Sequence, residues 1–139
     1  MKLNTYGESY GPISLESQTV SLELAKILKQ YGVEQGRSQF VHLKTKHAKG
    51  IYFATPSIRA LLGSEGTEWC DAYTVGEMAE LLPDQITDHK TLIIGRWKGM
   101  WVARYERVGN QLSSIGGSCR TLADALATTC ISLKERTRI

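Results

Sequence analysis

Aromatic and cationic residues alternate along an apolar stretch that runs from residue 92 to residue 106. They are Arg96, Trp97, Lys98, Trp101, Arg104 and Tyr105. A planar side chain can stack on a nucleobase while a neighbouring cation holds the phosphate. The stretch therefore predicts a surface that binds a nucleotide. The alternative interpretation is structural, with the rings in the core or in a subunit contact and the charges in solvent.

Alternation along the expected hairpin divides these residues between two faces. The second strand places Trp101, Ala103 and Tyr105 on one face, and Arg104 with Glu106 on the other. Near the turn, the pattern predicts that two tryptophans of the hairpin lie side by side. One of the two faces must belong to the core.

Arg120 stands immediately before Thr121, which is the expected N-cap of the last helix. Unpaired backbone amides at a helix N-terminus attract anions, so Arg120 and Thr121 predict a phosphate site. On this basis we expect Arg120→Ala to weaken nucleotide binding by about 1.5 kcal/mol or more. In the alternative, Thr121 is a structural cap beside an exposed arginine, because a hydroxyl that caps a helix is less free to bind a ligand.

Two loops offer further cations. Gly36 and Ser38 flank Arg37, and the glycine allows close approach of the backbone to an anion. The loop of residues 44–49 carries three lysines and a histidine. Neither loop has the spacing of a Walker or Rossmann phosphate motif. Charge that simply faces solvent is the alternative for both.

Catalytic signatures are weak in this chain. Cys119 lies beside Arg120 and just before a helix, and both features lower a thiol pKa. No base accompanies it in the local sequence, and the cysteines and histidines fit no zinc spacing. Glu77 and Glu80 are explained by helix capping and solvation. We therefore expect a protein that is not an enzyme and carries no cofactor or metal.

Composition bounds the function classes. With 139 residues, 42% of them hydrophobic, the chain is long enough for one domain with a real core. A net charge of +3 is too small for a polynucleotide-binding surface but suits a small anionic ligand. Three cysteines and no apolar leader indicate a reducing cytosol. No apolar run approaches the roughly 20 residues that cross a bilayer, so we expect no membrane partner.

Hydrophobic periodicity predicts the elements that carry these residues. We expect an irregular arm over residues 1–18 and a single α+β domain over residues 19–139, in which about three helices pack on a mainly antiparallel sheet. Expected helices cover 22–31, one turn at 58–62, 75–82, and the segment that Thr121 begins. Expected strands cover 40–43, 51–54, both arms of the hairpin within 92–106, and 111–115. A turn at 109–110 should precede the last strand, and Gly116 with Gly117 should end the sheet.

Local signals support the helix boundaries. Ser21 is a plausible N-cap for the first helix, and Gly32 supplies its left-handed end. Thr74 and Glu77 have the spacing of a capping box, and Pro83 closes the helix that follows them.

Three segments, residues 19–33, 73–83 and 121–127, together resemble small proteins encoded by phages and prophages. Among these, the chain is most similar to the Thoeris anti-defence sponges. Members of that family are oligomers that bind cyclic ADP-ribose-type signals, and in some cases cyclic oligonucleotides, without degrading them. The match lies mainly on helix framework.

The resemblance implies a homo-oligomer with a nucleotide pocket between protomers, lined by arginines and aromatics. The leading hypothesis is a phage-encoded sponge in the cytoplasm of an infected bacterium, which sequesters a cyclic nucleotide immune signal without cleaving it and so suppresses anti-phage defence. The expected nucleotide-binding residues are Arg120, Thr121, Arg104, Trp101, Tyr105, Arg37 and Arg96. The alternative is an interaction module that inhibits or regulates a host protein through the Trp97/Trp101 hairpin.

Overall fold

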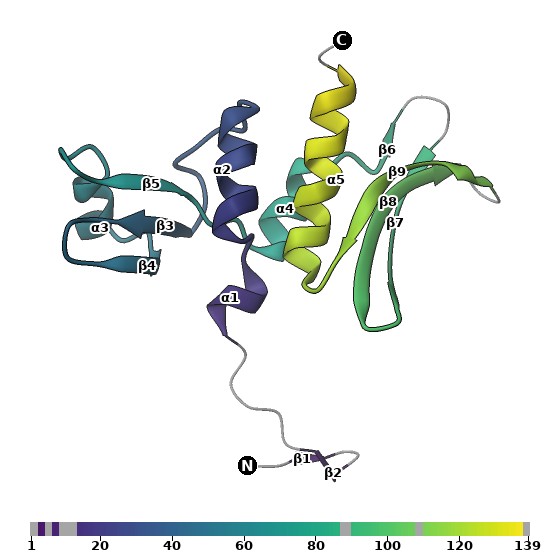
Figure 1. The fold of residues 1–139 in the computed structure, drawn as a ribbon, viewed down its shortest axis with the longest axis horizontal. Coiled ribbons are helices and arrows are strands. Elements are labelled where there is room, and N and C mark those ends of the chain that lie inside the picture. Colours follow the sequence, from purple (N-terminus) through teal and green to yellow (C-terminus); the bar gives the residue numbers. More distant parts are fainter. Residues whose placement is uncertain (1–2, 5–6, 9–13, 87–89, 108–109, 138–139) are drawn as a thin grey trace.

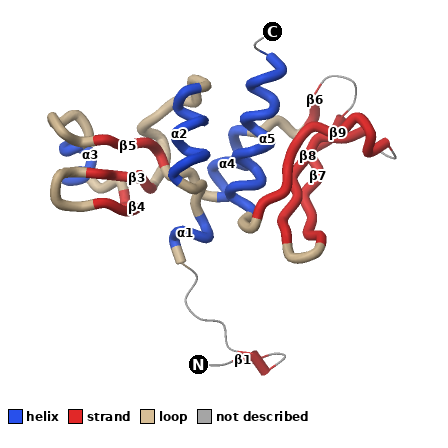
Figure 2. The backbone as a smooth tube through the Cα atoms, viewed as in Figure 1, coloured by secondary structure: helices blue, strands red, loops and turns tan. Residues whose placement is uncertain are grey.

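The computed structural model describes residues 3–4, 7–8, 14–86, 90–107 and 110–137. The predicted class is confirmed: the chain is a single compact α+β domain. A layer of helices lies between a smaller and a larger antiparallel sheet, so the sheet structure is divided in two (Figure 1). Figure 2 shows most of the helices in the middle, a sheet on either side, and one short helix beside the small sheet.

The small sheet has the strand order β4-β3-β5. Its strands are β3 (Phe40–Lys44), β4 (Lys49–Phe53) and β5 (Glu68–Asp71). The predicted hairpin with a basic tip is confirmed, whereas β5 was not expected. The short helix α3 (Pro56–Leu61) begins two residues before the predicted turn, because Pro56 occupies its first position and Thr55 caps it.

Two helices follow their predicted boundaries closely. They are α2 (Leu22–Gln30) and α4 (Val75–Leu81). Gly32 has a φ of 86° just beyond α2, as a left-handed helix end requires. The capping box at α4 is present, with Thr74 and Glu77 bonding reciprocally. Ser21 is the N-cap of α2, but its side chain makes no capping bond.

The large sheet has the order β6-β7-β8-β9. Its strands are β6 (Gln85–Ile86), β7 (Lys90–Trp97), β8 (Met100–Arg107) and β9 (Asn110–Cys119). Lys98 and Gly99 have φ of 50° and 80°, which suits a tight two-residue hairpin turn. Trp97 pairs with Met100, and Trp101 pairs with Arg96. The two tryptophans therefore lie on opposite faces, and the expectation that they adjoin is wrong.

The last strand corrects a second prediction. β9 continues through Gly116 and Gly117, which were expected to break the sheet. A Cβ at Gly116 would lie 2.2 Å from the carbonyl oxygen of Ala103, and a Cβ at Gly117 would lie 2.6 Å from Cγ2 of Thr128. These glycines let neighbouring elements approach the strand closely. The turn expected at Gly109 falls outside the described residues.

The final helix, α5 (Leu122–Thr137), is the centre of the core. It packs against β8 and β9 on one side and against α2 and α4 on the other (Figure 1). Its buried residues extend beyond the predicted stripe and are Ala123, Ala125, Leu126, Ala127, Thr129 and Cys130. This helix is covered on several sides, whereas a single apolar stripe would have fitted a surface helix.

The N-terminal part holds three short elements. They are β1 (Leu3–Asn4), β2 (Gly7–Glu8) and α1 (Leu15–Gln18). Ser14 caps α1, which lies near α5. Among the helices that the structure describes, none is both long and apolar enough to cross a membrane.

Candidate functional site

Two of the hairpin aromatics, Trp101 and Tyr105, face the core. Tyr105 is fully buried, and its hydroxyl donates to the carbonyl oxygen of Pro83. Burial raises the pKa of Tyr105 to about 12, so the phenol is neutral. Trp101 is partly buried against the core, and the Arg96 guanidinium lies 4.9 Å from its ring centroid. Tyr105 is therefore a core residue, and the prediction that it stacks on a base is wrong.

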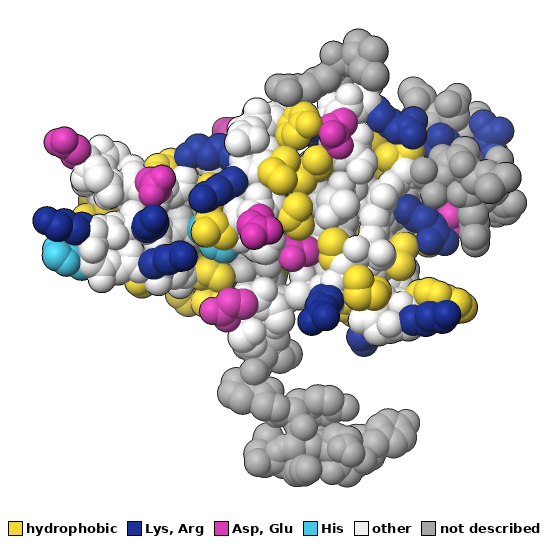
Figure 3. All heavy atoms as spheres, viewed as in Figure 1, with side chains coloured by type: hydrophobic (Ala, Val, Ile, Leu, Met, Phe, Trp, Pro, Cys, Tyr) yellow, Lys and Arg dark blue, Asp and Glu magenta, His cyan; other side chains and the backbone are white. Residues whose placement is uncertain are grey.

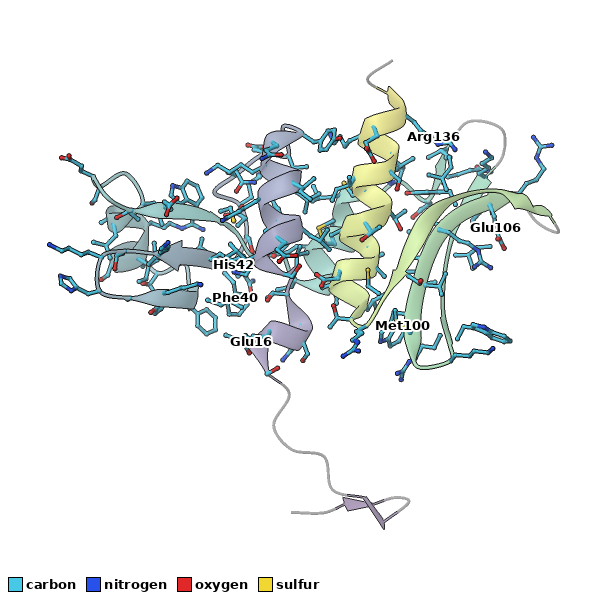
Figure 4. The ribbon with its side chains drawn as sticks, in the orientation of Figure 1. Glu16, Phe40, His42, Met100, Glu106 and Arg136 are labelled. Carbon is cyan, nitrogen blue, oxygen red and sulfur yellow. The ribbon has the colours of Figure 1, made fainter. Side chains whose placement is uncertain are left out.

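The opposite face of the hairpin carries Arg104. Its Nε donates to Oε2 of Glu106 at 2.6 Å, and these side chains are 30% and 9% exposed. Glu106 lies on the side of the sheet away from α5 (Figure 4). A hollow of about 480 Å³ on this face is lined by Arg104 and Trp97, and also by Arg96, whose guanidinium lies over the Trp101 ring on the other face. Because Glu106 already neutralises Arg104, this hollow has little unpaired positive charge for an anion.

Arg120 and Thr121 occupy the position that the sequence predicted, but the structural role accounts for Thr121. Its hydroxyl accepts from the amide of Asp124 at 3.2 Å, so it caps α5. Arg120 is exposed beside it. The Asp124 carboxylate accepts from the amide of Ser21 at 2.7 Å and thereby ties the start of α2 to α5.

The backbone amides of the loop around Arg37 bind a carboxylate of the protein itself. Oδ2 of the buried Asp71 accepts from the backbone amides of Gly36, Arg37 and Ser38, at 2.8, 3.0 and 3.2 Å. The exposed Arg37 side chain pairs with Glu34, at 3.2 Å. An external phosphate would have to displace a buried carboxylate, so the prediction of a ligand site at Arg37 is not supported by this geometry.

Cys70 and Cys130 are buried, whereas Cys119 is partly exposed. Burial raises the pKa of Cys70 and of Cys130, which keeps both thiols protonated. Cys119 Sγ lies 3.4 Å from the hydroxyl of Thr128 on α5. Within the described residues, no group of three or more His, Cys, Asp and Glu side chains is arranged to hold a metal ion.

A larger hollow, about 910 Å³, lies between α2 and the small sheet. We call it the lysine pocket because four lysines line it. Two come from α2, and two come from the strand ends that flank the β3–β4 turn. They are Lys26, Lys29, Lys44 and Lys49. Figure 3 shows lysine and arginine side chains gathered over the small sheet and the adjoining side of α2.

The charge of the lysine pocket is positive. Glu16 and Glu68 also line it, so the cations outnumber the carboxylates by two. The Nζ of Lys44 lies 3.9 Å from Oε2 of Glu68, and both side chains are largely exposed, so this pair is weak. Within the described chain, neither Lys26 nor Lys49 forms an ion pair.

The floor of the lysine pocket is mostly apolar. His42, Ile51 and Cys70 stand side by side in the register of the small sheet, and Val20 adjoins them. Nε2 of His42 donates to the carbonyl oxygen of Val20 at 2.7 Å where the small sheet meets α2 (Figure 4). Burial lowers the pKa of His42, although this hydrogen bond and the charge of Asp124 act in the opposite direction. The imidazole is therefore a neutral, fixed part of the floor.

One side of the lysine pocket is aromatic. Lys29 Nζ donates to the carbonyl oxygen of Trp69 at 2.7 Å and lies 4.8 Å from the centroid of its ring. An indole beside an ammonium group can stack on a flat ligand whose charged part the lysines of the pocket hold. This arrangement combines an apolar floor with a few polar anchors, as small-molecule sites commonly do.

Sequence reasoning identified half of this site. The basic tip of the hairpin was recognised, but the lysines of α2 and the strand with Trp69 were not. Two signals pointed to them: Lys26 and Lys29 are three residues apart on one helix face, and residues 67–73 are rich in β-prone side chains.

The predicted site residues are therefore divided between the hairpin, the start of α5 and the Arg37 loop, and the convergent cationic site lies elsewhere, between α2 and the small sheet. No protein-family model, curated protein or solved structure matches this chain.

Proposed function

We propose that this protein binds a small phosphate-bearing nucleotide in the lysine pocket and retains it without cleaving it. The observation that carries the proposal is the convergence of four lysines from α2 and the β3–β4 hairpin beside Trp69. Phosphate oxygens accept hydrogen bonds from ammonium groups, and a base has the shape to stack on an indole.

A cyclic nucleotide signal is the specific ligand class that we propose, with sequestration as the function. The resemblance to anti-defence sponges supplies this ligand class, and the lysine pocket is compatible with its chemistry. A compact ligand with phosphates and purine-like rings needs cations and a flat apolar surface within one concave space. A volume of about 910 Å³ lies within the usual range for small-molecule sites.

Two lysine variants test the proposal. Lys26→Ala and Lys49→Ala each remove an ammonium group that has no carboxylate partner in the described chain, so no carboxylate loses an ion-pair partner. We expect each variant to weaken binding by about 1.5 kcal/mol, roughly tenfold in Kd. The measurement is isothermal titration calorimetry with cyclic ADP-ribose and with a cyclic dinucleotide.

Lys46→Ala is the matched control. Lys46 lies in the loop between Lys44 and Lys49, is exposed and does not line the lysine pocket. The Lys46→Ala variant removes the same charge as Lys49→Ala from the same loop. Because Lys46 does not line the pocket, Kd should stay nearly unchanged. Arg120→Ala should also have little effect, in contrast to the expectation from sequence.

Mass spectrometry of small molecules released by heating the purified protein would identify a ligand that copurifies. The proposal is wrong if neither nucleotide binds and none is released. It is also wrong if a nucleotide binds with an affinity that Lys26→Ala and Lys49→Ala leave unchanged.

A further inference from the structure

One edge of the large sheet is open along β7. On one side β7 pairs with β8 over its whole length. On the other side β6 pairs only with Thr91 and Lys90. In the part of the chain that the structure describes, no strand lies beside residues 93–97 on that side. The hairpin tip thus extends beyond the neighbouring elements (Figure 1).

The backbone direction at this edge follows from one hydrogen bond. The amide of Leu92 donates to the carbonyl oxygen of Asp84 at 3.0 Å, away from β8. Alternate residues of a strand direct their N–H and C=O groups to the same side, so Ile94 and Arg96 present theirs at the open edge. Unpaired edge groups of this kind are a template for another strand.

Apolar side chains accompany the open edge. Trp97 is 69% exposed and Ile94 is 43% exposed, although both belong to a regular strand. The inner face of the large sheet packs on α5, and the outer face is turned away from it. Trp97 shares the outer face with Ile93, and Ile94 shares the inner face with Arg96. A strand added to β7 would cover both faces at once.

We propose that this edge pairs with the same edge of a second copy of the chain, antiparallel and centred on Gly95. Ile94 of each copy then stands opposite Arg96 of the other, and these residues exchange backbone hydrogen bonds. Ile93 stands opposite Trp97 of the other copy, which buries the exposed indole. The two sheets become one continuous sheet across the two-fold axis.

The other symmetric registers are less favourable. Centring on Ile94 would require the outward amide of Leu92, which already donates to Asp84. Centring on Arg96 would place two arginine residues directly opposite each other, and like charges in that position are destabilising. The register centred on Gly95 needs no hydrogen bond from Leu92 when pairing ends at Trp97, and it places no two arginines opposite each other.

Gly95 also suits the centre of the interface. Directly opposite residues that are not hydrogen-bonded approach to about 4.5 Å between Cα atoms. A Cβ at Gly95 would meet nothing within 4 Å in the single chain, and Gly95 does not have a positive φ. The fold of one chain does not require glycine there, whereas a close approach of two strands favours it.

Charges at the ends of the interface are complementary. Pairing in this register ends at Trp97, because Asp84 already stands beside Leu92. Lys98, in the turn of one copy, then approaches the exposed Asp84 of the other. The Arg96 guanidinium lies over the Trp101 ring, toward β8 and away from the axis. The interface thus brings opposite charges together at its ends and turns like charges away from its centre.

Opposite substitutions at residue 94 test the register. Ile94→Glu places a carboxylate opposite Arg96 of the other copy, and Ile94→Arg places a guanidinium there. Because each cross-strand pair occurs twice, we expect the dimer dissociation constant to fall roughly two- to thirty-fold with Ile94→Glu and to rise by a similar factor with Ile94→Arg. Sedimentation equilibrium over a concentration series measures the constant.

Phe53→Glu and Phe53→Arg form the control pair. Phe53 is 61% exposed on the small sheet, so these variants change charge and hydrophobicity equally but should leave the dissociation constant unchanged. Gly95→Val should weaken the dimer while the single chain stays folded by circular dichroism, because there is space for the side chain.

Three results would overturn the inference. They are a wild-type chain that stays monomeric at every concentration, a shift in the same direction for both residue 94 variants, and a Gly95→Val variant that dimerises as well as wild type. The inference does not depend on the lysine pocket, so its failure would leave the proposed nucleotide binding unaffected.

Discussion

Asp71 shows how one side chain takes the place of an external ligand. Its Oδ2 collects three backbone amides of the loop at residues 36–38. The carbonyls of the same loop accept from the guanidinium of Arg59, at 2.9 Å to Gly36 and 3.1 Å to Ser38. The loop therefore has the chemistry of an anion site, and its own carboxylate satisfies that chemistry.

Removing this carboxylate should be costly. Asp71→Ala leaves three amides without their acceptor in a buried setting, and we expect the free energy of unfolding to fall by about 3 kcal/mol or more. Asp71→Asn should cost less, since an amide oxygen can still accept. Urea denaturation measures both.

Glu65→Ala, at an exposed carboxylate outside the proposed interface, serves as the control and should change stability by no more than about 0.5 kcal/mol. The role given to Asp71 would be contradicted if Asp71→Ala lowered the free energy of unfolding by as little as the control does.

At the level of elements, β9 is kept regular by two glycines with different neighbours. Gly116 has a φ of 154°, and the two atoms nearest to an added Cβ belong to the backbone of β8. Gly117 faces a side chain, Thr128 of α5. The first glycine permits strand–strand contact, and the second permits the helix to pack on the strand.

This difference predicts which substitution can be rescued. Gly117→Ala should reduce the free energy of unfolding by about 1–3 kcal/mol through overpacking. Thr128→Ser removes Cγ2 and should recover part of that loss in a double-mutant cycle. Gly116→Ala should be more damaging, and Thr128→Ser should not rescue it, because the clash is with backbone. Equal rescue of both variants would show that the two contacts are not distinct.

At the scale of the whole molecule, a few polar contacts join the small sheet to the helical layer. The side chain of His42 on β3 bonds to the carbonyl of Val20 just before α2. The Ser38 hydroxyl, just before β3, donates to Glu77 of α4 at 2.6 Å. The lysine pocket lies along this junction, so the same contacts that hold the two parts together also shape it.

His42 should make the stability of this junction sensitive to acid. Its pKa is lowered by burial, so the unfolded chain takes up a proton at a higher pH than the folded chain does. Stability should therefore decline as pH falls below about 6.5 and continue to decline until the lowered pKa is passed. For this single group, the slope is at most about 1.4 kcal/mol per pH unit.

The measurement is the free energy of unfolding between neutral and acid pH. His42→Gln should flatten the profile, whereas His47→Gln, at an exposed histidine in the hairpin tip, should leave it unchanged. The assignment fails if both variants keep the slope of the wild-type chain.

Local chemistry was sufficient to predict most elements from the sequence. The capping box at Thr74, the left-handed Gly32 and the apolar periodicity of α2 act over a few residues, so they are readable without knowledge of distant partners. Strand alternation likewise assigned Ala103 and Tyr105 to one face, and the burial of both residues agrees with that assignment. The sequence by itself therefore determined the α+β class and the boundaries of its main helices and hairpins.

Tertiary structure alone decided which charged groups meet. β5 is four residues long and becomes a strand because it pairs with β3, about thirty residues earlier. Lys26 lines the same pocket as Lys44 and Lys49 because α2 lies beside the small sheet. The hydrogen bond from Ser21 to Asp124, which spans 103 positions, helps to hold the start of α2 against α5. Such contacts leave no short-range pattern, since the two partners are adjacent only after the chain has folded.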